Sequence, residues 1–275
     1  METIPQERWQ LTDSGAQHYE RYTVAQLFEP LARSLLEGVA LQPGQRLLDV
    51  ACGTGIVARL AAPRVAPAGE IVGIDLNEGM LATAKSCAEA AGLKIRWQQG
   101  DASALPYEDA SFDVVFCQQG LQFFPDKSGT LREMYRVLAP GGTLALAVFG
   151  TPNRFVLALA ESLAKHADAQ SAKQCLAPFL FTDPEVLRAI ANKAGINTVT
   201  IRRVLLTRRF EPSQYWLLQT TSGMPYAHAI VDMDAVVRAE VVRDIAACLK
   251  GLWNDDHFAV PSEVYLAYAQ KYAQK

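Results

Sequence analysis

The fold is decided by the stretch Leu47-Leu48-Asp49-Val50-Ala51-Cys52-Gly53-Thr54-Gly55. A short apolar run, typical of a buried strand, ends in an acid and opens into a Gly-x-Gly turn. The glycines permit unusual backbone angles and the close approach of a ligand. A helix expected at residues 56–64 would present free N–H groups to that turn. The sequence therefore predicts a strand, a ligand-binding turn and a helix in succession.

Strands and helices alternate on both sides of this stretch. Apolar runs predict strands, and apolar residues recurring every three or four positions predict helices. We expect strands at residues 46–50, 70–75, 94–98, 112–117 and 143–149. We expect helices at residues 24–39, 56–64, 78–92 and 127–138. Because β-α-β units form a parallel sheet with helices on both faces, the sequence predicts an α/β fold.

The second half of the chain is less regular. A helix is expected at 183–194, a strand at 199–207, and a last strand at 262–269, for which a terminal helix is the alternative. The expected organisation has three parts: an N-terminal helical cap at 1–45, a core at 46–150 and a C-terminal half at 151–275. Helical additions at about 151–180 and 212–251 are expected to form a lid over the substrate.

Composition excludes several classes of protein. The chain has 275 residues, of which 50% are hydrophobic and 20% charged, so it is an ordinary globular sequence. Its net charge of −3 argues against a nucleic-acid binder. The five cysteines are scattered, so neither a disulfide framework nor a metal site is expected. Without a leader or a long apolar run, a cytoplasmic protein with no integral membrane association is expected.

The turn after the first strand has two interpretations. Gly53, Gly55 and Ala58 satisfy the dinucleotide pattern G-x-G-x-x-G/A, and Asp75 follows where a carboxylate binds ribose hydroxyls. A nicotinamide cofactor therefore stays open. Asp49 favours a different ligand, because a carboxylate there would repel a pyrophosphate and attract an amino group. Nor does a Tyr-x-x-x-Lys pair follow the fourth strand.

At this point the sequence resembles the class I methyltransferases that use S-adenosylmethionine. The resemblance is to the small-molecule branch that includes the quinone C-methyltransferases, and it covers about residues 15–150. The matching motifs are Leu47 to Gly55, Gly73-Ile74-Asp75-Leu76-Asn77, Gly100-Asp101-Ala102, Leu105-Pro106-Tyr107 with Ser111-Phe112-Asp113-Val114-Val115, and Arg136-Val137-Leu138-Ala139-Pro140-Gly141-Gly142.

The resemblance implies a Rossmann-like sheet of seven strands that ends in an antiparallel hairpin. It implies S-adenosyl-L-methionine as cofactor and S-adenosyl-L-homocysteine as product. Asp49 would hold the methionine amino group, Asp75 the ribose and Asp101 the adenine, and an N-terminal aromatic, Tyr19 or Tyr22, would close over the cofactor. The expected cofactor-binding residues are Tyr22, Asp49, Ala51, Gly53, Gly55, Asp75, Leu76, Met80, Asp101, Ala102 and Gln118.

The expected activity is in-line methyl transfer to a hydrophobic or aromatic small molecule. We expect the protein to act in secondary metabolism. Candidate substrate residues are Gln119, Phe123, Phe149, Trp216 and Tyr226. No fixed catalytic residue marks the family, and the candidates are His18, Tyr22 and His228. The alternatives are a nicotinamide-dependent oxidoreductase and a non-catalytic S-adenosylmethionine-binding protein. The acceptor atom and the oligomeric state stay open, with a homodimer as one assembly.

Overall fold

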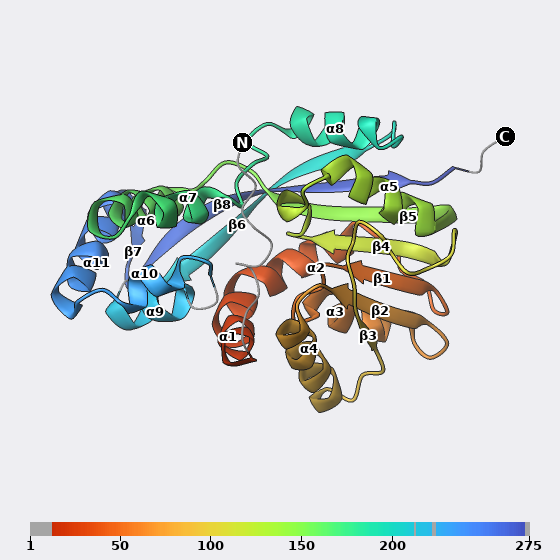
Figure 1. Ribbon diagram of the computed structural model, residues 1–275, viewed down its shortest axis with the longest axis horizontal. Coiled ribbons are helices and arrows are strands. Elements are labelled where there is room, and N and C mark those ends of the chain that lie inside the picture. Colours follow the sequence, from red (N-terminus) through yellow and green to blue (C-terminus); the bar gives the residue numbers. More distant parts are fainter. Residues whose placement is uncertain (1–12, 212, 222–223, 273–275) are drawn as a thin grey trace.

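The computed structural model describes residues 13–211, 213–221 and 224–272. One mixed sheet runs through the chain in the order β3-β2-β1-β4-β5-β8-β6, and a short β7 pairs with β8 (Figure 1). The strands are β1 Arg46–Val50, β2 Glu70–Asp75, β3 Arg96–Gln99, β4 Phe112–Gln118, β5 Leu138–Phe149, β6 Thr200–Phe210, β7 Trp253–Asn254 and β8 His257–Gln270. Seven strands were predicted, and β7 is the addition.

The first five strands are parallel, as the alternating pattern predicted. β8 lies between β5 and β6 and is antiparallel to both. This pairing settles the C-terminal alternative in favour of a strand. β5 begins at Leu138, five residues before the predicted start, because Leu138 pairs with Phe112 across an irregularity in the ladder.

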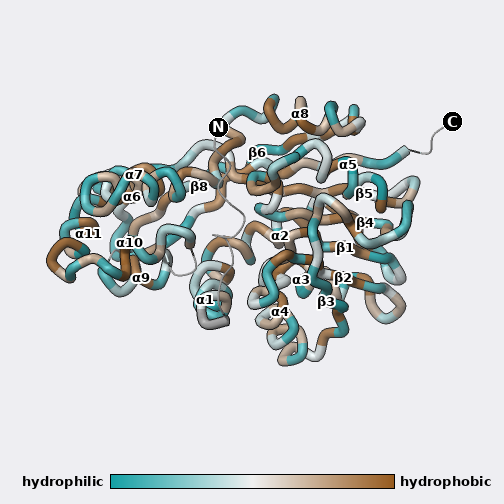
Figure 2. The backbone as a smooth tube through the Cα atoms, viewed as in Figure 1, coloured by the Kyte–Doolittle hydropathy of each residue, from teal (hydrophilic) through white to brown (hydrophobic). Residues whose placement is uncertain are grey.

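Helices cover both faces of the sheet (Figures 1 and 2). On one face α5 Lys127–Val137 and α8 Pro184–Lys193 bury Leu131, Met134 and Leu187. On the other face α2 Glu29–Glu37 and α3 Ile56–Val65 bury Leu31, Leu35 and Val57. α4 Glu78–Ala90 follows β2, and the side chain of Asn77 caps it by accepting from the Met80 N–H.

The N-terminal segment departs from a regular α-helix. After α1 Asp13–His18, residues Tyr19–Phe28 form a π-helix, labelled η2, before α2 begins. The Glu29 N–H donates to the Val24 carbonyl, five residues earlier, which is the π-helical bond. The wider turn changes which side chains share a face of this helix.

A second group of helices packs beside the sheet, and we name it the lid after the role predicted from the sequence, which stays a prediction. It consists of α6 Arg154–His166, α7 Ala169–Leu176, α9 Gln214–Thr221, α10 Ala227–Val231 and α11 Ala235–Leu249. These helices share a core with the ends of β6 and β8, which contribute Phe210, Phe258 and Val260. Because both strands continue into the sheet, the lid is anchored on the sheet itself (Figure 1). No helix in the described residues is long and apolar enough to cross a membrane.

Candidate active site

A cavity of about 310 Å³ lies where the parallel strands end. It is lined by residues that follow β1, β2 and β4, by the π-helix and by the lid. β1 and β4 are neighbours here, so the cavity sits at the point where the strand order reverses. Ligands of open α/β sheets bind at such a point.

The loop after β1 is shaped by three residues in the left-handed region. Ala51 has a φ of 53°, Gly53 of 55° and Gly55 of 79°. A Cβ at Gly53 would meet nothing within 4 Å, whereas a Cβ at Gly55 would lie 2.2 Å from the Trp97 ring. Gly53 lines the cavity, and Gly55 makes room for the indole that supports the loop.

Asp49 is a buried carboxylate that lacks a cationic partner among the described residues. It is 2% exposed, and it accepts one hydrogen bond, of 3.1 Å, from the Ala58 N–H at the start of α3. Burial raises the pKa of Asp49 to about 7, and the charge of Asp75 adds to this. A ligand with a positive charge would relieve the unfavourable burial.

Asp75 lies at the end of β2, beside the same loop. One carboxylate oxygen accepts from the Gly53 N–H at 2.8 Å, and the other accepts from the Asn77 N–H at 2.9 Å. Burial raises the pKa of Asp75, and these backbone hydrogen bonds oppose the rise. A carboxylate offers about four lone-pair sites, so two remain for hydroxyl donors.

The part of the cavity wall next to Asp75 combines apolar side chains with one further carboxylate. Leu76 is 37% exposed, Met80 is half-buried and Ala102 is buried, and all three line the cavity. Asp101 is exposed at the cavity edge, where it accepts from the Ser103 N–H at 2.8 Å. This arrangement suits a flat ring that carries an amino group.

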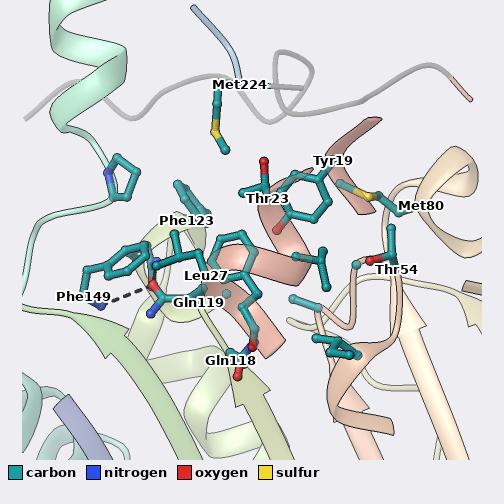
Figure 3. Close-up of a pocket in the computed structure, with 18 of the residues that line it drawn as sticks. Tyr19, Thr23, Leu27, Thr54, Met80, Gln118, Gln119, Phe123, Phe149 and Met224 are labelled. Atoms are coloured by element: carbon teal, nitrogen blue, oxygen red, sulfur yellow. Dashed lines mark hydrogen bonds between the residues drawn. The ribbon is translucent and has the colours of Figure 1, made fainter. Parts of the chain in front are cut away.

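Three glutamines lie on the lid side of β4. The Gln118 amide donates to the Phe28 carbonyl at 3.2 Å. Gln119 accepts from Gln122 at 2.6 Å and from the Phe149 N–H at 3.2 Å, the bond drawn in Figure 3. The Gln118 Oε1, Gln119 Nε2 and Gln122 Oε1 atoms are buried and find no hydrogen-bond partner within the described part of the chain. The wall thus offers one donor and two acceptors to a ligand.

The structure brings most of the predicted residues to this cavity. The predicted residues that line it are Asp49, Ala51, Gly53, Asp75, Leu76, Met80, Asp101, Ala102, Gln118, Gln119, Phe123, Phe149 and Tyr226. Figure 3 shows Met80 and Phe149 on opposite flanks, with Leu27 between them. Their roles in binding stay predictions, because no ligand contact tests them.

Five predicted residues lie elsewhere. Gly55 supports the loop from behind, and Trp216 stacks on Phe210 at 4.1 Å in the lid core. Tyr22 stacks on His18 at 6.1 Å, and a hydrogen bond with Tyr22 raises the pKa of Tyr215 on α9. The chain's four histidines all lie in the described residues, and none of them lines the cavity, so His18 and His228 are not placed for catalysis.

Tyr19 takes the cavity position that was assigned to Tyr22. It lines the cavity together with Thr23, Val24, Leu27 and Phe28, at steps of four and five residues. These steps suit the wide turn of the π-helix, which brings Tyr19 rather than Tyr22 to the cavity wall. Tyr19 packs on Phe28 at 5.4 Å between ring centres, and burial raises its pKa.

Several residues of the cavity wall were not predicted from the sequence. Arg208, Thr220, Thr221 and Cys175 line the cavity. They come from β6, α9 and α7, which meet only in the folded chain. Among the described residues, no group of three or more His, Cys, Asp or Glu side chains is arranged to hold a metal ion.

Comparison with known proteins places the chain in a family. The family model described as "Methyltransferase domain" matches residues 48–146. The chain is 35% identical over 183 residues to the ubiquinone/menaquinone biosynthesis C-methyltransferase UbiE of Ectopseudomonas mendocina, covering 61% of this chain and 71% of that protein. The chain belongs to the S-adenosylmethionine-dependent methyltransferases. This membership confirms the resemblance predicted from the motifs.

Two further relatives each match less than half of this chain. It is 46% identical over 108 residues to the demethylmenaquinone methyltransferase of Thermus thermophilus, covering 39% of this chain and 49% of that protein. The match to the Deinococcus radiodurans enzyme of the same name covers 47% of that protein. The chain thus spans about half the length of these relatives.

Solved structures support the fold alone. Phosphoethanolamine N-methyltransferase 2 of Haemonchus contortus, in complex with phosphomonomethylethanolamine and S-adenosylhomocysteine, superposes with a TM-score of 0.61 at 22% identity. The superposition covers 95% of this chain and 58% of that chain. The [4+2]-cyclase SpnF superposes with a TM-score of 0.54 at 24% identity, covering 89% of this chain and 81% of that one.

The residues present fit the cofactor of this family. Asp49 offers a buried negative charge for an ammonium group, and Asp75 has lone pairs left for two hydroxyls. Gly53 leaves open space beside the loop, and Leu76, Met80 and Ala102 offer an apolar surface for adenine. Charge, hydrogen bonding and shape therefore agree with S-adenosylmethionine.

We predict that Gly55→Ala lowers the free energy of unfolding more than Gly92→Ala. Both glycines have a positive φ, of 79° and 66°, which costs an alanine about 1–2 kcal/mol. Only the Cβ at residue 55 would also meet the Trp97 ring, and such overpacking costs about 1–3 kcal/mol more. Urea unfolding of both variants measures the difference. Equal losses would show that Trp97 moves aside freely.

Proposed function

We propose that this protein transfers the methyl group of S-adenosylmethionine to a hydrophobic or aromatic small molecule. The observation that carries the proposal is the buried Asp49 carboxylate, which faces a cavity continuous with an apolar, lid-covered chamber. UbiE and the demethylmenaquinone methyltransferases are named for quinones, which are ring compounds within this broad class.

Each carboxylate has a defined part in holding the cofactor. Asp49 pairs with the amino group, Asp75 accepts from the ribose hydroxyls, and Asp101 accepts from the adenine amino group. The cavity-lining Ala51 and Gly53 provide the backbone beside the methionine portion. When bound, S-adenosylmethionine supplies an electrophilic methyl group and a neutral thioether leaving group, so that transfer is an in-line displacement.

The substrate chamber supplies alignment and exclusion of water. Phe149 stacks on Phe179 at 5.1 Å, and Phe28 lies 6.3 Å from Phe149, so aromatic faces line one wall. The unpartnered Gln119 Nε2 and Gln118 Oε1 are positioned to bind polar groups on an otherwise apolar ring. Holding the acceptor in line and free of water is the main requirement for such a transfer. No histidine is required as a base in this scheme.

Two other functions are less well supported. A nicotinamide cofactor would bring its pyrophosphate beside the loop after β1, where the buried Asp49 would repel it. A non-catalytic or repurposed binder remains the second alternative, since a fold neighbour is named a cyclase and fold alone does not decide chemistry. Methyl transfer therefore needs a direct test.

The first test is calorimetric titration with S-adenosylhomocysteine, S-adenosylmethionine and NADH. We expect micromolar binding of both adenosyl ligands and no binding of NADH. Asp75→Ala should lose most of this binding, since it removes the acceptors for the ribose hydroxyls. Binding of NADH without adenosyl binding would overturn the proposal. Incubation with methyl-labelled S-adenosylmethionine and a panel of aromatic acceptors then tests transfer, and labelling of only peptides or nucleic acids would contradict the substrate class.

Cofactor binding should also depend on pH through Asp49. Burial raises the pKa of this carboxyl to about 7 in the unliganded protein, whereas the bound ammonium favours the ionised form. Below pH 7 binding must release a proton, so affinity for S-adenosylhomocysteine should fall by about tenfold per pH unit. Titrations between pH 5.5 and 7.5 measure this slope. Asp49→Asn, which has no proton to release, should bind more weakly and with no slope, and a slope retained in this variant would exclude Asp49 as its source.

A further inference from the structure

Arg208 is a buried cation in the wall of the cavity. It lies near the end of β6, is 9% exposed and faces the lid, whereas the next residue, Arg209, is exposed. This alternation is that of a strand, whose successive side chains point to opposite faces. Among the described residues that line the cavity, Arg208 is the only one with a cationic side chain.

The partners of Arg208 are neutral. Its Nη2 donates to the Thr220 hydroxyl and, at 3.4 Å, to the Gln26 side chain. The guanidinium also lies 5.6 Å from the Trp216 ring centre and 5.9 Å from that of Phe155. Its buried Nε has no hydrogen-bond partner, and no carboxylate in the described part of the chain forms an ion pair with it.

An unpaired charge in this position is unfavourable for the protein alone. Burial lowers the pKa of Arg208 to about 10, so the side chain still carries its charge at neutral pH. Buried charges in proteins are normally paired, because desolvation is costly. Tyr226, which also lines the cavity, is kept neutral by burial that raises its pKa, and its hydroxyl is hydrogen-bonded with the Cys175 thiol, so it supplies no negative charge. The missing partner is therefore an anion that enters the cavity.

The cofactor is poorly placed to be that partner. Its amino and carboxyl groups share one carbon, so Asp49 at the end of β1 holds both groups near β1. Arg208 belongs to β6, which is four strands away across β4, β5 and β8. At about 4.8 Å per strand, the two strands are about 19 Å apart in the sheet. The anion that meets Arg208 thus belongs to a second molecule.

We propose that Arg208 binds a carboxylate of the methyl acceptor, which makes the substrate a hydrophobic or aromatic acid. The inference rests on the proposed function and specifies its substrate class. The planar guanidinium fork matches a carboxylate, and a single arginine suits a single negative charge. The acid group lies against Arg208 and Thr220, and the apolar body of the molecule lies among the phenylalanines of the chamber.

The test compares two probes of nearly the same shape, the anion 2-naphthoate and the neutral amide 2-naphthamide. Each is titrated by calorimetry into the full chain saturated with S-adenosylhomocysteine. We expect the wild-type protein to bind 2-naphthoate about tenfold more tightly or better, the range of a hydrogen-bonded charged group. Arg208→Met should bind both probes alike. Arg209→Met, on the exposed face of the same strand, is the matched control and should retain the full preference.

Three results would overturn this proposal. The first is no preference for 2-naphthoate in the wild-type protein, and the second is a preference that survives in Arg208→Met. The third is loss of S-adenosylhomocysteine binding in Arg208→Met, which would assign the arginine to the cofactor's carboxylate. A wild-type protein that fails to bind S-adenosylhomocysteine at all would instead refute the proposed function. If Arg208→Met does not fold, Arg208→Lys is tested in its place. Lysine keeps the charge but lacks the planar guanidinium, so 2-naphthoate binding should still weaken several-fold.

Discussion

The burial of Asp49 is the constraint on which the site depends. Asp49 lies near the carboxyl end of β1, a central strand of the sheet. One backbone N–H is the only hydrogen-bond partner of its carboxylate among the described residues. Raising its pKa to about 7 costs on the order of 4 kcal/mol relative to an exposed carboxylate above that pH. Because the folded state holds the proton more tightly, the unliganded protein should lose this stability as pH rises from about 4 to 7. A cationic ligand that pairs with the ionised Asp49 restores this stability, so binding of the ligand also stabilises the folded protein.

The chamber beside the cofactor is built from elements that also hold the molecule together. β6 and β8 run from the central sheet into the lid, where Phe210 and Phe258 join the lid core. The π-helix is held on the other side by the Glu20 carboxylate, which pairs with Arg59 of α3 at 2.5 Å. Since both walls are anchored in the sheet, the shape of the chamber is set by the fold rather than by loose loops.

The sequence predicted the part of the site that depends on local pattern. β1 and β2 begin and end at the predicted residues, because each is a short buried run that a turn terminates. Tyr19 and Tyr22 were both candidates for the aromatic over the cofactor, and the π-helix that brings Tyr19 to the cavity is not visible in a pattern of apolar residues. Arg208 was missed because the strand was expected to end at residue 207. Which of two adjacent arginines is buried depends on where the lid packs, and that is a long-range property of the chain.

The acidic and basic side chains that line the cavity come from different strands of the sheet. Asp49 and Asp75 lie at the ends of β1 and β2 and Asp101 follows β3, whereas Arg208 lies on β6, four strands from β1. A cationic cofactor and an anionic acceptor would each meet the opposite sign at its own end of the cavity. Exchanging the two would place like charges together, which penalises the wrong orientation. The carboxylates belong to the sequence motifs of the core, whereas the arginine belongs to β6, which packs against the lid. A substitution at the arginine can therefore change selectivity for the acceptor without altering how the cofactor is held.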